Sequence, residues 1–208
     1  MHRDLLLKGL TAMIPKTTFR NFQNDSGISS ISVAKSLFNF LSSNNIGRIS
    51  KNAIEFSGSD RIHAAILALE MGCDIEDVSL RLSWKDFEQL TSQLLLSFGY
   101  KTKTNVHLTN PRMEIDVVAI SSGIAIVIDC KHWRRCNYSL MSSFTRKQSA
   151  RAKRLLELES GIDQAVPVMI TLHAESVNLV EGVPVVPIHK FSSFVLNVNY
   201  CASKGYGL

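Results

Sequence analysis

The most informative part of the chain is EIDVVAISSGIAIVIDCK, residues 114–131. Two runs rich in Val and Ile flank Ser122-Gly123, a pattern that predicts two antiparallel strands joined by a two-residue turn. Such a turn sets the register, and it places Asp116 opposite Asp129 and Glu114 opposite Lys131. Side chains two apart on a strand share a face, so these four ionisable groups are expected to converge while Cys130 points to the other face.

Opposed carboxylates among apolar residues are destabilising unless something offsets their charge. A divalent cation such as Mg²⁺ does so, because it binds one or two carboxylates and leaves positions for phosphate oxygens. Lys131 could then position or help deprotonate a water and stabilise charge on a phosphate. The arrangement suits phosphodiester hydrolysis. The alternative is that Lys131 only neutralises Asp129 and Glu114 as an ion pair at a strand end.

The residues around this hairpin predict an α/β domain. Ser83 is expected to cap a helix that ends at Gly99. Further elements are expected in the order strand 100–108, strands 115–121 and 124–131, a basic helix around 142–159, strand 165–171, a short strand at 183–186, and a helix or strand at 191–198. The order α-β-β-β-α-β predicts a mixed sheet flanked by helices.

The first part of the chain is predicted to be mainly helical. One helix stops near Pro15, a short one follows, and Ser29 or Ser30 caps a third whose apolar residues are Ala34, Leu37, Phe38 and Leu41. Residues 48–50 and 53–56 flank Lys51-Asn52 as a small hairpin. Helices followed by a hairpin suggest a winged helix, which would bring Lys35, Arg48 and Lys51 to DNA or serve protein contact instead.

Charge and composition narrow the classes of function. The 208 residues carry a net charge of +5, and residues 131–154 contain eight Lys or Arg and no Asp or Glu. This basic stripe is either a solvated helix face or a phosphate-contacting surface, and the missing i,i+4 acidic partners favour the latter. The longest uncharged apolar stretch, residues 117–128, is too short to span a bilayer, so we expect a cytoplasmic protein without membrane association.

Glu88 on a helix, Asp116 on the second strand and Asp129-Cys130-Lys131 on the third resemble the PD-(D/E)xK nuclease superfamily, in particular Mrr-type restriction endonucleases and archaeal Holliday-junction resolvases. The likeness covers residues 84–186, in order and spacing as well as in residue type. There are two departures. Ile115 stands where the superfamily's name has Pro, and Asp129 replaces the more frequent Glu, which shortens the reach of that ligand.

The resemblance implies a restriction-endonuclease-like core over residues 83–208, preceded by a helical connector at 59–82 and a winged-helix-like domain at 1–58. It makes Asp116, Asp129 and the carbonyl of Cys130 ligands of Mg²⁺ or Mn²⁺, which Glu88 supports directly or through water, and it makes Lys131 the catalytic lysine. Candidate DNA contacts are Lys131, His132, Arg134, Arg135, Arg146, Lys147, Gln148 and Arg151. Gln148 has the alternative of a solvent-facing glutamine. We expect a homodimer that binds DNA and no organic cofactor.

Three functions remain open from the sequence. The leading hypothesis is a metal-dependent DNA endonuclease acting in repair, recombination or restriction, similar to archaeal fusions of a winged helix with an Mrr-like nuclease. The second is a DNA-binding protein whose nuclease fold is inactive and whose ion pairs are structural. The third is a transcription regulator whose C-terminal domain senses or dimerises. Intact Glu88, Asp116, Asp129 and Lys131 favour the first.

Overall fold

In the computed structural model, Ser122 and Gly123 form a two-residue turn with positive φ angles of 50° and 77°. This is the conformation of a tight hairpin turn, and it favours glycine. The Gly123 carbonyl accepts a hydrogen bond from the backbone N–H of Asp163 at 2.7 Å. The two strands pair from Ser121–Ile124 to Val117–Ile128, which confirms the predicted register over that length. Asp116 and Asp129 lie one residue beyond the last pair.

The structure describes residues 2–50, 53–132, 137–172 and 178–198. The chain divides into two compact units, residues 1–86 and 87–208. Among the described residues, no helix is both long and apolar enough to cross a membrane. The predicted positions Lys51, Arg134 and Arg135 lie outside the described residues.

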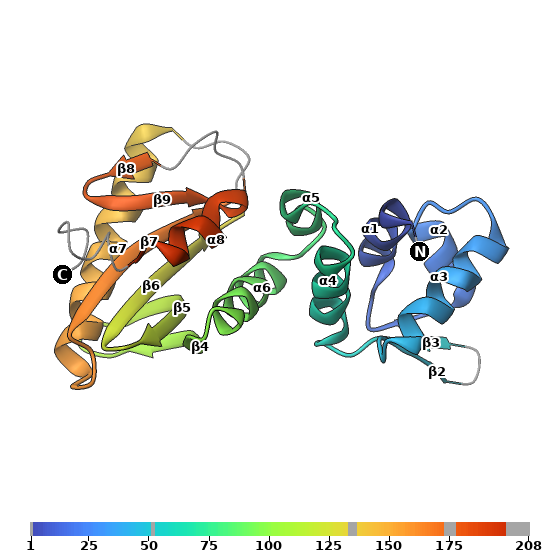
Figure 1. Cartoon of the computed structure of the whole chain (residues 1–208), viewed down its shortest axis with the longest axis horizontal. Helices are drawn as coiled ribbons and strands as arrows, with labels where there is room; N and C mark the ends of the chain where they lie inside the picture. Colours follow the sequence, from blue (N-terminus) through green and yellow to red (C-terminus); the bar gives the residue numbers. More distant parts are fainter. Residues whose placement is uncertain (1, 51–52, 133–136, 173–177, 199–208) are drawn as a thin grey trace. The chain divides into compact units, whose positions relative to one another are not determined.

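Helix α6 (Trp84–Ser97) leads into the second unit (Figure 1). The elements that follow are β4 (Lys101–Leu108), β5 (Met113–Ser121), β6 (Ile124–Lys131), α7 (Tyr138–Leu158), β7 (Gln164–Thr171), β8 (Asn178–Val180), β9 (Val183–Pro187) and α8 (Ile188–Leu196). Six strands form one sheet in the order β4-β5-β6-β7-β9-β8. β6, β7 and β9 are parallel and the other pairs are antiparallel, so the predicted mixed sheet flanked by helices is confirmed.

The two long helices of this unit contact opposite faces of β6. On the α6 side, the Cys130 thiol donates to the Thr91 hydroxyl at 3.8 Å. On the α7 side, the Gln148 amide donates to the carbonyl of Val127 at 2.7 Å. Because neighbouring residues on a strand face opposite ways, the side chain of Asp129 belongs to the α7 face and that of Cys130 to the α6 face.

Three features of this unit differ from the sequence prediction or decide an alternative that it left open. Helix α7 begins at Tyr138, before the predicted start near residue 142, because the side chain of Asn137 caps it by accepting from the Leu140 N–H at 2.8 Å. The short edge strand β8 was not predicted. The last segment, predicted as a helix or a strand, is helix α8, which begins directly after β9.

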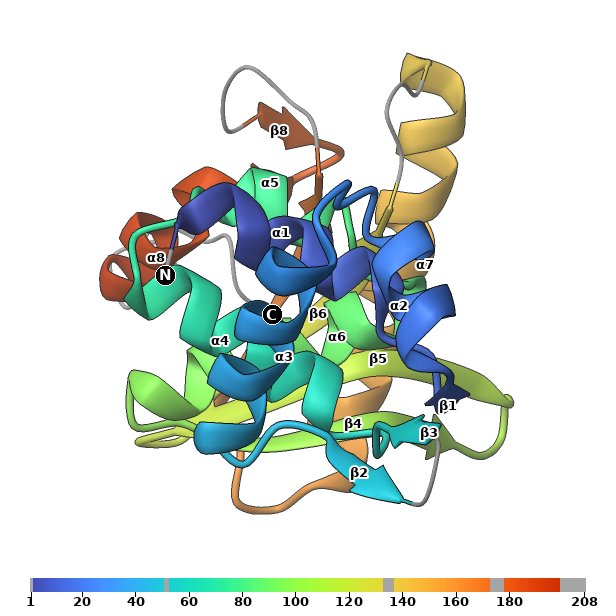
Figure 2. The same cartoon turned by 90° about the vertical axis from the view of Figure 1, so that its right-hand side faces the viewer.

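The first unit combines helices with a three-stranded sheet (Figure 2). Its elements are α1 (Arg3–Ala12), β1 (Lys16–Thr17), α2 (Phe19–Asp25), α3 (Ile31–Ser43), β2 (Arg48–Ser50), β3 (Ala53–Glu55), α4 (Asp60–Glu70) and α5 (Ile75–Ser79). The strand order is β1-β3-β2, and both pairs are antiparallel. The predicted hairpin is confirmed as β2 and β3, which pair up to Ser50–Ala53.

The predicted apolar face of α3 forms the centre of this unit. Ala34, Leu37, Phe38 and Leu41 are all buried. The ring of Phe38 makes edge contacts with Phe22 and Phe56, with centroids 6.2 and 6.3 Å apart. Aromatic rings from α2, α3 and the end of β3 therefore pack together and stabilise the contact between the helices and the small sheet.

Candidate active site

Asp129 lies at the centre of the candidate site and is 1% exposed. Its Oδ2 atom is 2.8 Å from the Nζ atom of Lys131, two residues further along β6. Its Oδ1 atom is 2.7 Å from the Nη1 atom of Arg151 on helix α7. Each oxygen of this buried carboxylate therefore contacts one cation.

Asp116 is the second buried carboxylate of the site. Its Oδ2 atom accepts a hydrogen bond from the Cys130 backbone N–H at 2.7 Å. Burial, followed by the charge of Asp129, raises the pKa of Asp116 to about 6, although the Cys130 N–H, Lys131 and Arg151 act in the opposite direction. The charge of Asp129 thus disfavours ionisation of Asp116, although the two residues lie one position beyond the last confirmed strand pair.

Glu114, the fourth group expected to converge, is not brought to this pair. It is exposed and lies opposite His107 of β4. The paired part of β5 and β6 stops at Val117–Ile128, so the regular register on which that expectation depended does not extend to Glu114.

Glu88 and Cys130 occupy the α6 side of β6. Glu88 is buried on α6, and its charge is among the causes that raise the pKa of the Cys130 thiol, after burial and the charge of Asp116. The thiol is completely buried, as expected for a core cysteine. Glu88 therefore lies near Cys130, on the face of β6 opposite to that of Asp129.

Helix α7 sends a buried polar pair towards Asp129. Gln148 is completely buried, and its Oε1 atom accepts from Arg151 Nη1 at 3.0 Å while its amide donates to Val127. The solvent-facing alternative for Gln148 is therefore wrong. Arg151 also points inwards, to Asp129, although the sequence analysis placed it among residues that contact DNA.

Two aromatic rings border the site. The Nζ atom of Lys131 lies 4.9 Å from the centre of the Phe144 ring on α7, a cation–π distance. His132, a half-buried residue, places its ring edge-on to Phe87 with centroids 5.8 Å apart. Phe144 therefore helps to direct the ammonium group of Lys131 towards Asp129.

Thr171 is a site residue that the sequence analysis missed. It lies beside Lys131 in the parallel pairing of β6 and β7, so its side chain shares the face of Lys131 and Asp129. Its hydroxyl is buried and has no hydrogen-bond partner within the described residues. A buried polar group without a protein partner commonly contacts water or a ligand. The signal in the sequence was its position at the end of the strand next to Lys131.

The outer face of α7 carries the remaining predicted DNA contacts that the structure describes. Arg146 is exposed and lies 3.3 Å from the Glu181 carboxylate, and Lys147 is exposed beside Phe144. These side chains keep their basic heads at the surface. They differ in this from Gln148 and Arg151 on the same helix.

The donor atoms of the site fit a divalent cation. Across the described ranges, no three His, Cys, Asp or Glu side chains group closely enough to hold a metal ion. Asp116 and Asp129 nevertheless supply hard oxygen donors, and their mutual repulsion is the situation that a shared cation relieves. A hard cation such as Mg²⁺ is commonly bound by one or two carboxylates and waters, so this pair is sufficient in type and number.

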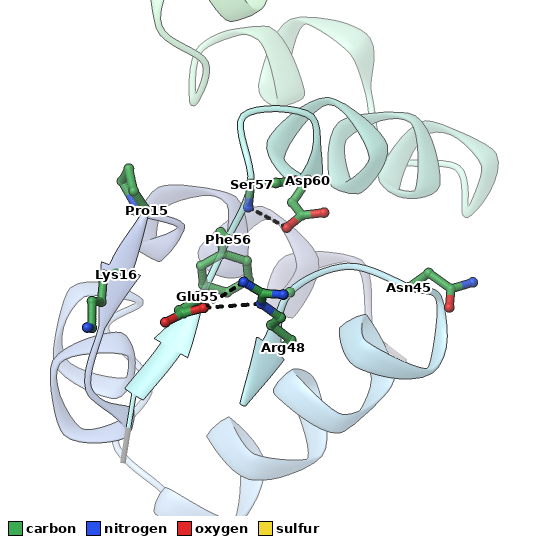
Figure 3. Close-up of a pocket in the computed structure, with 9 residues that line it drawn as sticks. Pro15, Lys16, Asn45, Arg48, Glu55, Phe56, Ser57 and Asp60 are labelled. Carbon is green, nitrogen blue, oxygen red and sulfur yellow. Dashed lines mark hydrogen bonds and ion pairs between the residues drawn. The ribbon is translucent and has the colours of Figure 1, made fainter. Parts of the chain in front are cut away.

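A separate hollow of about 570 Å³ lies in the first unit (Figure 3). Phe56 lies within it, and Arg48 and Glu55 form an ion pair of 3.1 Å at its edge. Asp60 accepts a hydrogen bond from the Ser57 backbone N–H at 2.6 Å in the same hollow. Arg48 and Glu55 are paired with each other here, and none of the predicted catalytic residues lines this hollow.

One comparison with known protein families concerns the second unit. The family described as nuclease-related domain (NERD) matches residues 83–192, more than half of the chain. An uncharacterized protein of Archaeoglobus fulgidus is 28% identical over 130 residues, covering 60% of this chain and 99% of that protein.

Two solved structures also resemble the chain. The crystal structure of AF1548, a protein of unknown function, shares 28% identity, with 43% of this chain and 47% of that chain covered and a TM-score of 0.32. The crystal structure of VC1899 from Vibrio cholerae shares 11% identity, with 97% and 50% covered and a TM-score of 0.43. The chain thus spans about half the length of these two solved proteins.

Proposed function

Because the chain belongs to the nuclease-related domain family, we propose that it is a metal-dependent endonuclease that hydrolyses phosphodiester bonds in DNA. The family match supports the likeness to the PD-(D/E)xK nuclease superfamily, and the Mrr-type assignment is part of the proposal. One observation carries it: the buried carboxylates of Asp116 and Asp129 lie next to each other, with the ammonium of Lys131 at 2.8 Å from Asp129.

In this proposal Asp116, Asp129 and the carbonyl of Cys130 hold Mg²⁺ or Mn²⁺, whereas Glu88, on the α6 side of β6, is not assigned as a direct ligand. When bound, the ion supplies Lewis-acid stabilisation of the phosphate. Asp116 is kept in place for this role by its hydrogen bond to the Cys130 N–H, which favours its ionised form.

Lys131 is proposed to be the catalytic lysine. Its ammonium is directed by Asp129 on one side and by the Phe144 ring on the other, so it is held where charge develops on a phosphate. The buried hydroxyl of Thr171 beside it is suited to orient a water. In this proposal the buried site speeds hydrolysis because it holds Lys131 and Thr171 close to each other in a fixed geometry.

The DNA backbone is proposed to lie against the exposed basic face of α7. Arg146 and Lys147 project there, and Arg134 and Arg135 precede the helix in sequence. Contacts of Lys and Arg with phosphate give affinity without sequence preference. Gln148 and Arg151 are assigned instead to the interior of the site.

The first unit is proposed to be a winged-helix-like domain that helps to bind DNA or to form a homodimer. What supports this is the element order α1-β1-α2-α3-β2-β3 together with the strand order β1-β3-β2. Helix α3 would offer the exposed Lys35 to DNA, and β2 would offer Arg48. Such a fusion suits a role in DNA repair, recombination or restriction.

A second candidate function is a DNA-binding protein or transcription regulator whose nuclease fold is inactive. The observation in its favour is that both oxygens of Asp129 contact cations of the chain itself, as in a structural ion-pair network. If the nuclease fold is inactive, the chain binds DNA equally well with and without divalent metal and cleaves no DNA substrate.

One experiment separates the two. The purified protein is incubated with plasmid, branched DNA and single-stranded DNA in Mg²⁺, in Mn²⁺ or in EDTA. The endonuclease proposal expects cleavage in metal, none in EDTA, and loss of cleavage in Asp129→Asn while DNA binding persists. Binding without cleavage of any substrate in either metal would favour the inactive fold.

A further inference from the structure

Asp129 is already neutralised by two cations that come from different elements. Lys131 follows it on β6, and Arg151 reaches it from α7. The contacts of 2.8 and 2.7 Å occupy one carboxylate oxygen each, so a hard cation that binds Asp129 has to share an oxygen with one of them.

Arg151 is held by two hydrogen bonds. Its Nη1 atom bridges Asp129 Oδ1 and Gln148 Oε1, at 2.7 and 3.0 Å. Gln148 is in turn fixed to the Val127 carbonyl on the same strand as Asp129. A series of hydrogen bonds therefore connects α7 and β6, running from Asp129 through Arg151 and Gln148 to Val127. Three of these residues are buried, and the side chain of Arg151 is 22% exposed.

We propose that Arg151 is a positioning residue, the internal counter-ion of Asp129, and that it competes with a divalent cation for the Oδ1 atom of this carboxylate. The proposal rests on the proposed function. Arg151 offsets the buried charge of Asp129 while the cation is away, because a buried charge without a partner is strongly destabilising. It also opposes the cation by charge, since the two would lie on the same carboxylate. Arg151 thereby lowers the metal affinity of the site.

The assignment differs from that of a DNA contact. A phosphate-contacting arginine adds to the salt dependence of DNA binding and leaves metal affinity unchanged. A counter-ion does the opposite: its removal strengthens metal binding without needing DNA. A residue with a merely structural role would, on removal, leave metal affinity unchanged or weaken it.

The test measures Mn²⁺ binding by isothermal titration calorimetry in the full chain. Arg151→Met removes the charge and keeps most of the bulk. Arg151→Gln removes the charge but retains a donor for Asp129, which guards against a folding defect. Lys153→Met is the matched control, since Lys153 is an exposed cation two residues away on the same helix.

We expect both Arg151 variants to bind Mn²⁺ about tenfold more tightly than the wild type, because one opposing charge is removed at close range, and Lys153→Met to bind it unchanged. Equal or weaker binding by the Arg151 variants, in a wild type that binds Mn²⁺ and cleaves DNA, would overturn the counter-ion role alone. Absence of Mn²⁺ binding in the wild type and in all variants, together with absence of cleavage, would overturn the proposed function as well.

Discussion

The Oδ2 atom of Asp116 accepts a hydrogen bond from the backbone N–H of Cys130 at 2.7 Å. This contact joins β5 to β6 just beyond their last paired residues, Val117 and Ile128. It fixes Asp116 next to Asp129 although the two carboxylates repel each other and burial disfavours their charge. The fold therefore holds two mutually repelling carboxylates at the position where the proposed cation would reduce their repulsion.

The first prediction concerns the pH dependence of stability at Asp116. Burial and the charge of Asp129 raise the pKa of Asp116 to about 6, above its value of 3.8 in the absence of these effects. Between these two pKa values the folded state binds more protons than the unfolded state, so the folded state loses stability as the pH rises from the lower value to the higher one. Asp116→Asn keeps an acceptor for the Cys130 N–H but carries no charge. In EDTA we expect it to be more stable than the wild type at pH 8 by about 2 kcal/mol, a difference that shrinks towards pH 5.

Urea denaturation at several pH values measures this difference, and the same variant should lose cleavage at pH 8. A stability difference that is constant between pH 5 and pH 8 would mean that Asp116 does not titrate as a repelled, buried carboxylate.

The second prediction concerns the buried hydroxyl of Thr171. If this hydroxyl is kept for a water or a ligand, Thr171→Val removes an unsatisfied group and raises the free energy of unfolding in EDTA by about 1 kcal/mol, while cleavage slows. The control is Thr145→Val on α7, because the Thr145 hydroxyl donates to the Ser142 carbonyl at 3.0 Å. A loss of stability in Thr171→Val greater than in Thr145→Val would contradict the assignment.

The sequence was sufficient for the centre of the second unit because local rules apply there. The Ser122-Gly123 turn determines which residues of the two strands face each other, and the confirmed pairs run from Ser121–Ile124 to Val117–Ile128. Helix α3 was predicted for a similar reason, since its apolar spacing depends only on the helical period.

The missed strand β1 depends on a distant partner. β1 has two residues and exists as a strand because Lys16 pairs with Glu55, far along the chain. β8 has three residues and pairs with β9, the strand that follows it directly, so its partner is local. The burial of Gln148 had a visible signal, because Gln148 interrupts a stripe formed by Phe144, Ala152 and Leu155 on α7. The inward reach of Arg151 follows from the position of Asp129 across the helix–sheet contact, which no local pattern contains.

The third prediction concerns the exposed face of α7. Each phosphate neutralised by Lys or Arg contributes roughly 0.9 to the slope of log affinity against log salt on duplex DNA. Changing Arg146 and Lys147 to Ala should lower the slope by about two if both contact phosphate, and should weaken binding to all sequences alike. Fluorescence anisotropy of labelled DNA, titrated with protein at several salt concentrations, measures this slope. Lys101→Ala with Lys103→Ala, on the exposed edge strand β4, is the control pair with the same change in charge.

The fourth prediction concerns the first unit. Lys35→Ala removes an exposed cation from α3, the helix proposed to face DNA. If this unit only assists binding, the variant lowers the salt slope by at most about one and leaves cleavage in excess enzyme unchanged. A loss of DNA affinity larger than that of the Arg146 and Lys147 double variant would move DNA recognition to the first unit and favour the transcription-regulator alternative.

Plasmid cleavage by purified wild type, Asp129→Asn and Lys131→Met in Mg²⁺, in Mn²⁺ and in EDTA measures whether these residues form a nuclease site. The wild type is expected to cut in either metal and not in EDTA. Asp129→Asn is expected to lose cleavage while binding DNA at least as tightly, because it removes a negative charge near the phosphate. Lys131→Met is expected to slow cleavage about 100-fold or more while it still binds Mn²⁺. Cleavage by both variants at the rate of the wild type would contradict the assignment of the site.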